Sequence, residues 1–208
     1  MMPDSGTHPP STATAELLAD RFAPEPAFSV LRHRVVDADT ATTYAAVRGF
    51  DFMEVGGPLV RAAGWVRGLP ERFRRGHGPS VPTRLTFDDM TTDSDWVVLG
   101  ERPGFELVAG VAGRFWQPVI EWRRVEPGEF AEFREPGYGK IVLSLSVRGY
   151  GEQRSLLSYD IRVTLTDSAS LARFRLYWAV ASPFIKAIHT ATLRTIARDA
   201  ENANPEGK

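Results

Sequence analysis

The sequence has no cysteine, and this absence excludes several kinds of chemistry together. The chain can form no disulfide, carries no thiolate nucleophile and offers no thiolate ligand to a metal ion. The lack of thiols fits a reducing compartment, so we expect a cytoplasmic protein. Histidine is also scarce: His8, His33, His77 and His189 are scattered along the chain, and their spacing predicts no metal site.

Familiar motifs of catalysis and cofactor binding are missing too. The sequence has no G-x-S-x-G motif of a serine nucleophile, no G-x-G-x-x-G motif and no phosphate-binding loop with its lysine. These absences count against a hydrolase, a dehydrogenase and a nucleotidase. We therefore expect no cofactor.

Charge and hydropathy give two further exclusions. Lys plus Arg number 25 and Asp plus Glu number 26, so the chain lacks the basic excess of a protein that holds nucleic acid. Residues 1–10 do not resemble a secretory signal, and no run approaches the ~20 apolar residues needed to cross a bilayer. We expect no nucleic-acid partner and no stable membrane insertion, while the oligomeric state stays open.

The residues that are present predict a folded core. Hydrophobic residues make up 43% and aromatic residues 11% of the 208 residues, enough apolar surface to offset the entropy of ordering one domain. The N-terminal region is rich in Pro, Ser, Thr and Ala, which is typical of a tail. We expect a flexible tail over residues 1–25, a single domain over 26–200 and a second tail over 201–208.

The first half of the predicted domain begins with a strand at 28–36, followed by a short helix that Asp39 or Thr40 caps. A second short helix is predicted to begin at Pro58, after two glycines. A long polar connection over 71–95 follows, rich in arginine, glycine and aspartate.

The second half reads as a sheet and one long helix. Strand-like runs lie at 96–101, 105–111, 115–122 (less clearly), 129–135, 140–147 and 155–165. Short Pro-Gly and Gly-containing breaks separate them, too short for crossover helices, so the pairing should be antiparallel.

The alternation of apolar and polar residues in these strands gives the sheet one apolar face and one polar face, and we expect the polar face to be exposed to solvent. An amphipathic helix from Ser168 to about Arg198 should cover the apolar face, with a bend near Ser182 caused by Pro183.

This order of elements resembles the START-like superfamily, also called SRPBCC or Bet v 1-like. More specific are Phe-Glu-Leu at 105–107 running into Gly-Arg-Phe-Trp at 113–116, Ile-Arg-Val at 161–163, Thr-Asp at 166–167 and Arg-Phe-Arg-Leu-Tyr-Trp at 173–178. The resemblance covers roughly residues 28 to 198. It implies an α+β helix-grip fold, in which a curved antiparallel sheet wraps around a long C-terminal helix and two short helices follow the first strand.

The resemblance also implies a cavity between sheet and helix. Members of this superfamily hold lipids, sterols, polyketides or other apolar molecules there, and a minority are cyclases, aromatases or hydrolases. The candidate lining residues are Phe105, Leu107, Trp116, Leu143, Tyr159, Ile161, Phe174, Trp178 and Ile185. The alternative for each ring is that it simply fills the core.

Three polar residues are candidate ligand contacts. The alternation places Glu106 and Arg162 on the polar face, where they would form a surface ion-pair cluster with Asp160. A bulge that turned them inward would instead make a buried pair able to orient a ligand. His189 lies one residue from the apolar stripe of the last helix, so it is either a hydrogen-bonding ligand contact or a flanking residue.

The function predicted first is a binding or carrier domain for a small hydrophobic molecule. The alternative is a cyclase-like, aromatase-like or dehydratase-like enzyme in which Tyr159, Glu106 or His189 acts as acid or base. A third possibility is an interaction module that uses the connection over 71–95. The sequence names neither the ligand nor a pathway.

Overall fold

The computed structural model describes residues 16–51, 86–87 and 95–204, and its centre is an antiparallel sheet. The strand order is β1-β6-β5-β3-β2, and β4 pairs with β3 beside this path. The strands are β1 (Phe28–Val36), β2 (Val97–Arg102), β3 (Glu106–Gly113), β4 (Trp122–Arg123), β5 (Gly139–Gly149) and β6 (Ser155–Leu165). The predicted antiparallel pairing is confirmed for every one of these strand pairs.

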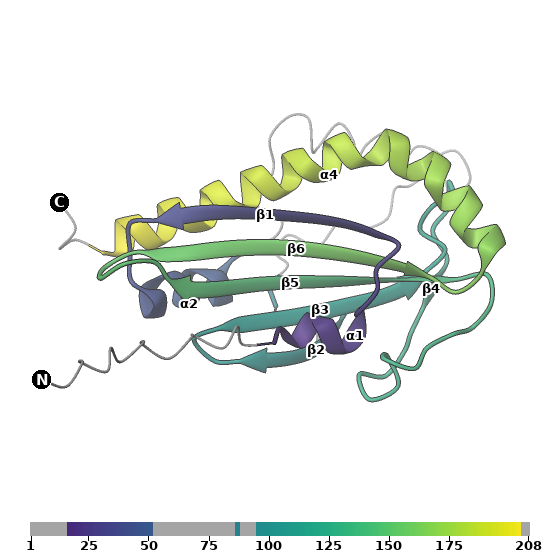
Figure 1. Ribbon diagram of the computed structural model, residues 1–208, viewed down its shortest axis with the longest axis horizontal. Helices are drawn as coiled ribbons and strands as arrows, with labels where there is room; N and C mark the ends of the chain where they lie inside the picture. The colour runs from purple at the N-terminus through teal and green to yellow at the C-terminus, as the bar shows by residue number, and fades with distance from the viewer. Residues whose placement is uncertain (1–15, 52–85, 88–94, 205–208) are drawn as a thin grey trace, which may run out of the picture.

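Three helices are described: α1 (Leu18–Phe22), α2 (Thr40–Gly49) and α4 (Ser168–Ala203). Helix α4 runs along one face of the sheet and lies against α2, β1 and β6, whereas α1 contacts β3 and β5. Figure 1 shows α4 arching along the whole length of the sheet. The predicted α+β arrangement with a long C-terminal helix is therefore confirmed. The second short helix predicted from Pro58 and the connection over 71–95 fall largely outside the described residues.

The start of α4 is fixed by Asp167. Its carboxylate accepts hydrogen bonds from the backbone N–H of Ser170 at 2.8 Å and of Gly137 at 2.6 Å. These bonds lower the pKa of Asp167 to about 2, because they stabilise the charged form. Pro183 lies inside α4 without ending it, and the helix continues five residues past the predicted end at Arg198. The proline is thus accommodated within a curved helix (Figure 1).

We call the side of the sheet that faces α4 the inner face. Leu107 of β3, Leu145 of β5 and Tyr159 of β6 lie side by side there, because the strand register pairs them directly. Each is almost completely buried. The predicted alternation of β3, β5 and β6 is confirmed on this face.

The opposite side, which we call the outer face, differs from the prediction. We expected a solvent-exposed polar surface, yet Glu106, Lys140 and Asp160 are all buried there. Helix α1 and the segment 125–133 cover them. The cluster that forms this cover consists of Ala19, Phe22, Ala23, Val108, Ala112, Val125, Phe130 and Val142.

The prediction of a tail over residues 1–25 is consequently wrong for its last part. Ala19, Phe22 and Ala23 have exposed fractions of 1%, 6% and 1%. These side chains bury apolar surface against β3, β5 and Phe130, which stabilises the segment by burial rather than by helix propensity. The wider domain limits remain a prediction.

Two predicted strands are also wrong. Residues 129–135 form consecutive turns and irregular chain instead of a strand, and of 115–122 only the last residue belongs to one, in β4. Lys140 donates hydrogen bonds to the carbonyls of Phe130 and Ala131, both at 3.0 Å, and so fixes the turn over β5. The Phe130 ring fits because β3 has Gly110 beneath it, where a Cβ would lie 2.6 Å from Phe130 Cζ.

Candidate functional site

Most of the predicted lining residues lie together between the sheet and α4, in two adjoining apolar clusters. The first cluster includes Leu107, Leu143 and Tyr159, and the second includes Trp116, Phe174 and Trp178. Ile161 on β6 packs against both clusters and joins them. The structure therefore brings these residues to one face, as predicted, although it does not by itself assign them a ligand.

Aromatic rings close the space near the start of α4. Phe174 is 1% exposed, and its ring centroid lies 5.0 Å from that of Phe28, 5.4 Å from that of Phe115 and 5.6 Å from that of Trp178. Edge-to-face and tilted pairs at such distances stabilise packing. For Phe174 the arrangement is that of a core-filling ring, so this end of α4 is held firmly to the sheet.

Phe105 does not join the predicted lining. It precedes β3 in the turn after β2, and its ring lies against the guanidinium groups of Arg102 and Arg148, 5.0 and 5.4 Å from the ring centroid. The cation–π geometry explains this position, because both arginines offer their charge to the ring at the sheet's end. Strand alternation alone had placed Phe105 with Leu107.

His189 is the polar residue that does lie beneath α4. It is fully buried, and its ring stacks on Tyr159 with the centroids 4.0 Å apart and the planes inclined by 26°. Neither ring nitrogen has a hydrogen-bond partner within the described part of the chain. Burial, with a smaller contribution from Arg32, lowers the pKa of His189 to about 4, so the imidazole is neutral at pH 7.

Two further groups share this buried position. Thr192, one turn after His189 on α4, is 1% exposed, and its hydroxyl also lacks a partner among the described residues. Burial raises the pKa of Tyr159, which keeps the phenol neutral. Buried polar groups normally take a hydrogen-bond partner, from the protein, from water or from a ligand. His189 and Thr192 therefore leave hydrogen-bonding atoms unsatisfied beneath α4 within the described residues.

The middle of α4 contacts the sheet loosely. Residues 175–188 include no buried side chain, whereas Phe174 before them and His189 after them are buried. Trp178, Ile185 and Ile188 in this stretch are only half-buried. The apolar side chains between the two firm ends of α4 are thus incompletely covered. A cavity in this place remains a prediction.

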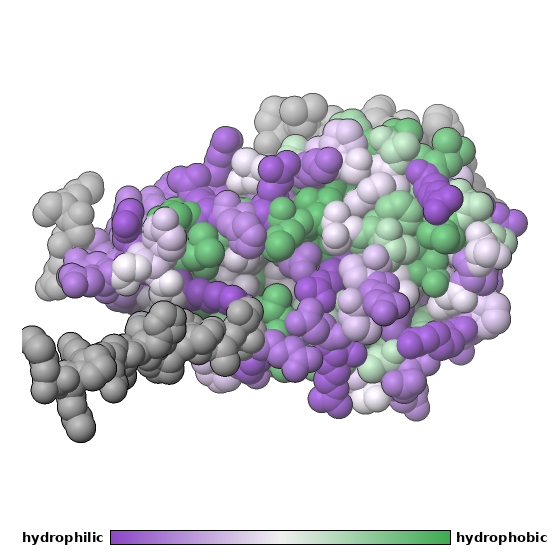
Figure 2. Space-filling view, in the orientation of Figure 1, coloured by the Kyte–Doolittle hydropathy of each residue, from purple (hydrophilic) through white to green (hydrophobic). Residues whose placement is uncertain are grey.

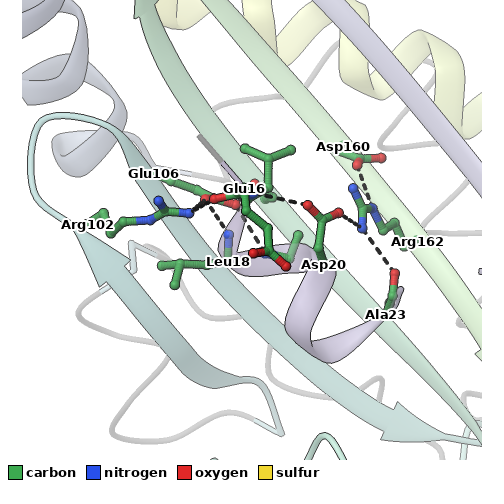
Figure 3. A network of polar contacts seen from close by, with 11 residues as sticks. Glu16, Leu18, Asp20, Ala23, Arg102, Glu106, Asp160 and Arg162 are labelled. Carbon is green, nitrogen blue, oxygen red and sulfur yellow. Dashed lines mark hydrogen bonds and ion pairs between the residues drawn. The ribbon is translucent and has the colours of Figure 1, made fainter. Parts of the chain in front are cut away.

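Glu106 is not a ligand contact of the inner face, because it lies on the outer face (Figure 3). Its carboxylate accepts hydrogen bonds from the backbone N–H groups of Leu18 at 2.7 Å and Ala19 at 3.2 Å, and from the Ser144 hydroxyl at 2.8 Å. Arg102 adds an ion pair at 3.2 Å. Glu106 therefore holds the start of α1 in place.

Arg162 belongs to the same cover and does not pair with Glu106. Its guanidinium binds Asp160 at 2.7 Å, Asp20 at 2.6 Å and the carbonyl of Ala23 at 3.0 Å (Figure 3). The register of β3 and β5 is regular from Glu106 to Gly113, so no bulge turns the glutamate inward. The alternative, in which a bulge turns Glu106 and Arg162 inward as a pair, is therefore wrong. The predicted ion-pair cluster exists, but it is largely buried rather than exposed.

A pocket of about 280 Å³ opens on the outer side of the molecule. It is lined by Arg123, Arg124, Val125, Glu129, Glu132, Phe133 and Glu135. Charges of both signs line it, and Arg123 pairs with Glu135 at 2.8 Å, so it does not suit an apolar ligand. Among the described residues, no three histidine or carboxylate side chains are grouped to hold a metal ion.

Sequence reasoning missed two buried polar residues. Thr192 was not among the predicted polar contacts, although its spacing of three from His189 places the two on the same side of the helix. Lys140 was assigned to a solvated face, and burial lowers its pKa to about 8. Its carbonyl partners come from a turn that had been read as a strand.

Comparison with known proteins gives distant structural likenesses. No family model matches the sequence, and no curated protein matches it significantly. A hypothetical protein of Helicobacter pylori is 11% identical, with 96% of this chain and 99% of that chain covered and a TM-score of 0.41. CalU16 of Micromonospora echinospora is 13% identical, with 84% of each chain covered and a TM-score of 0.28.

A third matched structure is the ZhuI aromatase/cyclase of a Streptomyces species, 11% identical, with 86% of this chain and 96% of that chain covered and a TM-score of 0.31. Likenesses of this size assign no activity to the chain. The antiparallel sheet with α4 along one face is the helix-grip arrangement that the START-like resemblance implied.

Proposed function

We propose that this protein binds a small, mostly apolar molecule between the inner face of the sheet and the middle of α4. The observation that carries the proposal is His189, which is fully buried with both ring nitrogens unpartnered in the described part of the chain. An unpaired buried polar group costs about 1–3 kcal/mol, so it favours a ligand that supplies the missing hydrogen bond. The loosely covered stretch 175–188 lies directly before it.

The surroundings define the chemical class of this molecule. Tyr159, Ile161 and Trp178 offer apolar surface, while His189 and Thr192 offer hydrogen bonds at one end. A carboxylate or ammonium group would be desolvated there without a counter-charge from His189, which is neutral at pH 7. The site therefore favours an apolar body with one neutral polar group, such as a hydroxyl or a carbonyl.

The hydrogen bonds and pKa values of the three acid–base candidates, Glu106, His189 and Tyr159, favour binding over catalysis. Glu106 is committed to the backbone of α1 on the other face. The lowered pKa of His189 makes the imidazole a weak base, and the raised pKa of Tyr159 makes the phenol a weak acid. General acid–base catalysis works best with groups whose pKa lies near the working pH, and neither group meets that condition.

Paired probes test the proposal. Naphthalene and 2-naphthol differ by one hydroxyl, and binding of each is followed by quenching of tryptophan fluorescence in the full chain. We expect the wild type to bind 2-naphthol more tightly, and His189→Leu to lose about tenfold in this preference, the value of one hydrogen bond. Native mass spectrometry of the purified protein should show a retained small molecule.

His33→Leu is the matched control. It removes a histidine from β1 that bonds Ser158 on the outer face at 2.8 Å, so the preference for 2-naphthol should stay unchanged. The proposal is overturned if the wild type binds neither probe and retains no molecule. It is also overturned if His189→Leu and His33→Leu affect the preference equally.

A further inference from the structure

We infer that the outward side of the first half of α4 is a docking surface for an anionic lipid bilayer. Three large apolar side chains form the main part of this surface. Their exposed fractions are 76% for Leu176, 67% for Val180 and 47% for Phe184. Their spacing of four places them along one side of the helix. Isolated exposed apolar residues are common, but a continuous stripe of them is characteristic of an interaction surface.

Small apolar residues complete the stripe. Ala172, Ala179, Pro183 and Ala187 are exposed, and helical spacing places them on the same side. The buried and half-buried residues Phe174 and Trp178 lie toward the sheet. The outward stripe is about 22 Å long at 1.5 Å per residue. Figure 2 shows hydrophobic residues at the upper right, over this part of α4.

The charges along α4 identify the partner. From Ser168 to Arg198 the helix contains no aspartate or glutamate, and its two carboxylates, Asp199 and Glu201, lie in the last turns beyond the stripe. The whole chain, in contrast, has a net charge of −1. The cations beside the stripe are Arg173, Arg175 and Lys186, and all are exposed. Arg194 and Arg198 lie further along the helix, where Arg198 pairs with Asp199 at 3.2 Å. A helical segment with an apolar outward side and only basic charges is suited to the interface of an anionic bilayer, with its apolar side toward the acyl chains.

A second copy of the chain fits this surface less well. If two α4 helices paired along the stripe in antiparallel fashion, Arg173 and Arg175 of one copy would approach Lys186 of the other, and a parallel pairing would align identical cations. Like charges across an interface disfavour the pair. Within the described ranges, no helix combines the length and apolarity needed to cross a membrane, so the contact would be peripheral.

Co-sedimentation with vesicles tests the inference on the full chain. We expect binding to vesicles of phosphatidylcholine and phosphatidylglycerol in equal parts at low salt, and at least tenfold weaker binding to phosphatidylcholine alone. Leu176→Glu combined with Val180→Glu should weaken binding to the anionic vesicles at least tenfold. Arg175→Gln combined with Lys186→Gln should weaken it less and reduce its dependence on salt.

Leu31→Glu is the matched control, because Leu31 is exposed at 51% on β1, outside the stripe. It should bind the vesicles like the wild type, and so should His189→Leu, which separates this inference from ligand binding. Circular dichroism confirms that each variant is folded. Failure of the wild type to bind anionic vesicles overturns the inference, as does an equal loss in Leu31→Glu. A dimer in sedimentation velocity that Leu176→Glu abolishes would assign the stripe to a second copy instead.

Discussion

The two faces of the sheet are covered in opposite ways. On the outer face, short segments are held by buried charges, and Glu106, Lys140 and Arg162 each bind two or more groups of the covering chain. On the inner face a single long helix covers apolar strands. Its buried histidine, His189, has no hydrogen-bond partner in the described part of the chain. The comparison shows that hydrogen bonds are satisfied by the covering chain around Glu106, Lys140 and Arg162, whereas both ring nitrogens of His189 remain without one in the described residues.

The packing of α1 and the segment 125–133 on the outer face depends most on Phe130. Phe130→Ala should therefore produce the largest loss of stability. The ring is completely buried above Gly110 and packs edge to face on Phe22, with centroids 6.3 Å apart. Removing it should lower the free energy of unfolding by about 3–5 kcal/mol. Urea unfolding measures the change. Phe133→Ala, at a half-buried ring, should cost clearly less, and equal losses would contradict the packing described.

Glu106→Gln tests the charged part of the outer cover. The amide keeps the shape but weakens the bonds to the N–H groups of Leu18 and Ala19, so unfolding should become easier by about 2 kcal/mol. Amide hydrogen exchange at these two residues should accelerate, because α1 is released locally. Unchanged exchange there would show that apolar packing alone holds α1.

The inner face should respond to acid through His189. Its folded pKa of about 4 lies below the unfolded value of ~6.5, so the unfolded chain binds more protons between these pH values. Stability should therefore fall as the pH is lowered from about 6.5 to 4, by on the order of 3 kcal/mol. His189→Leu should flatten this slope while His33→Leu retains it, as denaturant unfolding at several pH values would reveal.

The smallest effect is expected under the middle of α4. Ile185 is half-buried, so Ile185→Ala should cost less than about 1 kcal/mol, whereas Ile196→Ala, at a fully buried position, should cost about 2–5 kcal/mol. Thermal unfolding of the two variants compares them directly. Similar losses would mean that α4 packs evenly along its length.

Elements with clear periodicity could be predicted from the sequence. The bounds of β1 and β6 agree with the prediction, and α4 begins at the predicted residue, Ser168. Alternation in β3, β5 and β6 also predicted which side chains face α4. Such patterns are local, because each depends on neighbours a few residues apart.

The outer cover could not be predicted, because its contacts join distant parts of the chain. Glu106 meets backbone groups of α1 that lie 87 and 88 residues earlier. A helix of five residues has too few positions to show a period, and buried charges look like surface charges until their partners are known. The sequence indicates His189 as a candidate contact, but its burial and its lack of a hydrogen-bond partner among the described residues depend on packing against distant strands.

Helix α4 is attached at both ends and loosely packed between them. Asp167 ties its first turn to Gly137, and the last turns from Thr192 to Ala200 are buried against α2 and the sheet. Bending of the intervening turns can therefore change how closely they approach the sheet without detaching either end. If the protein binds a small molecule as proposed, entry of that molecule would require no unfolding of the helix, only a change in its curvature around Pro183, where a backbone hydrogen bond is already absent.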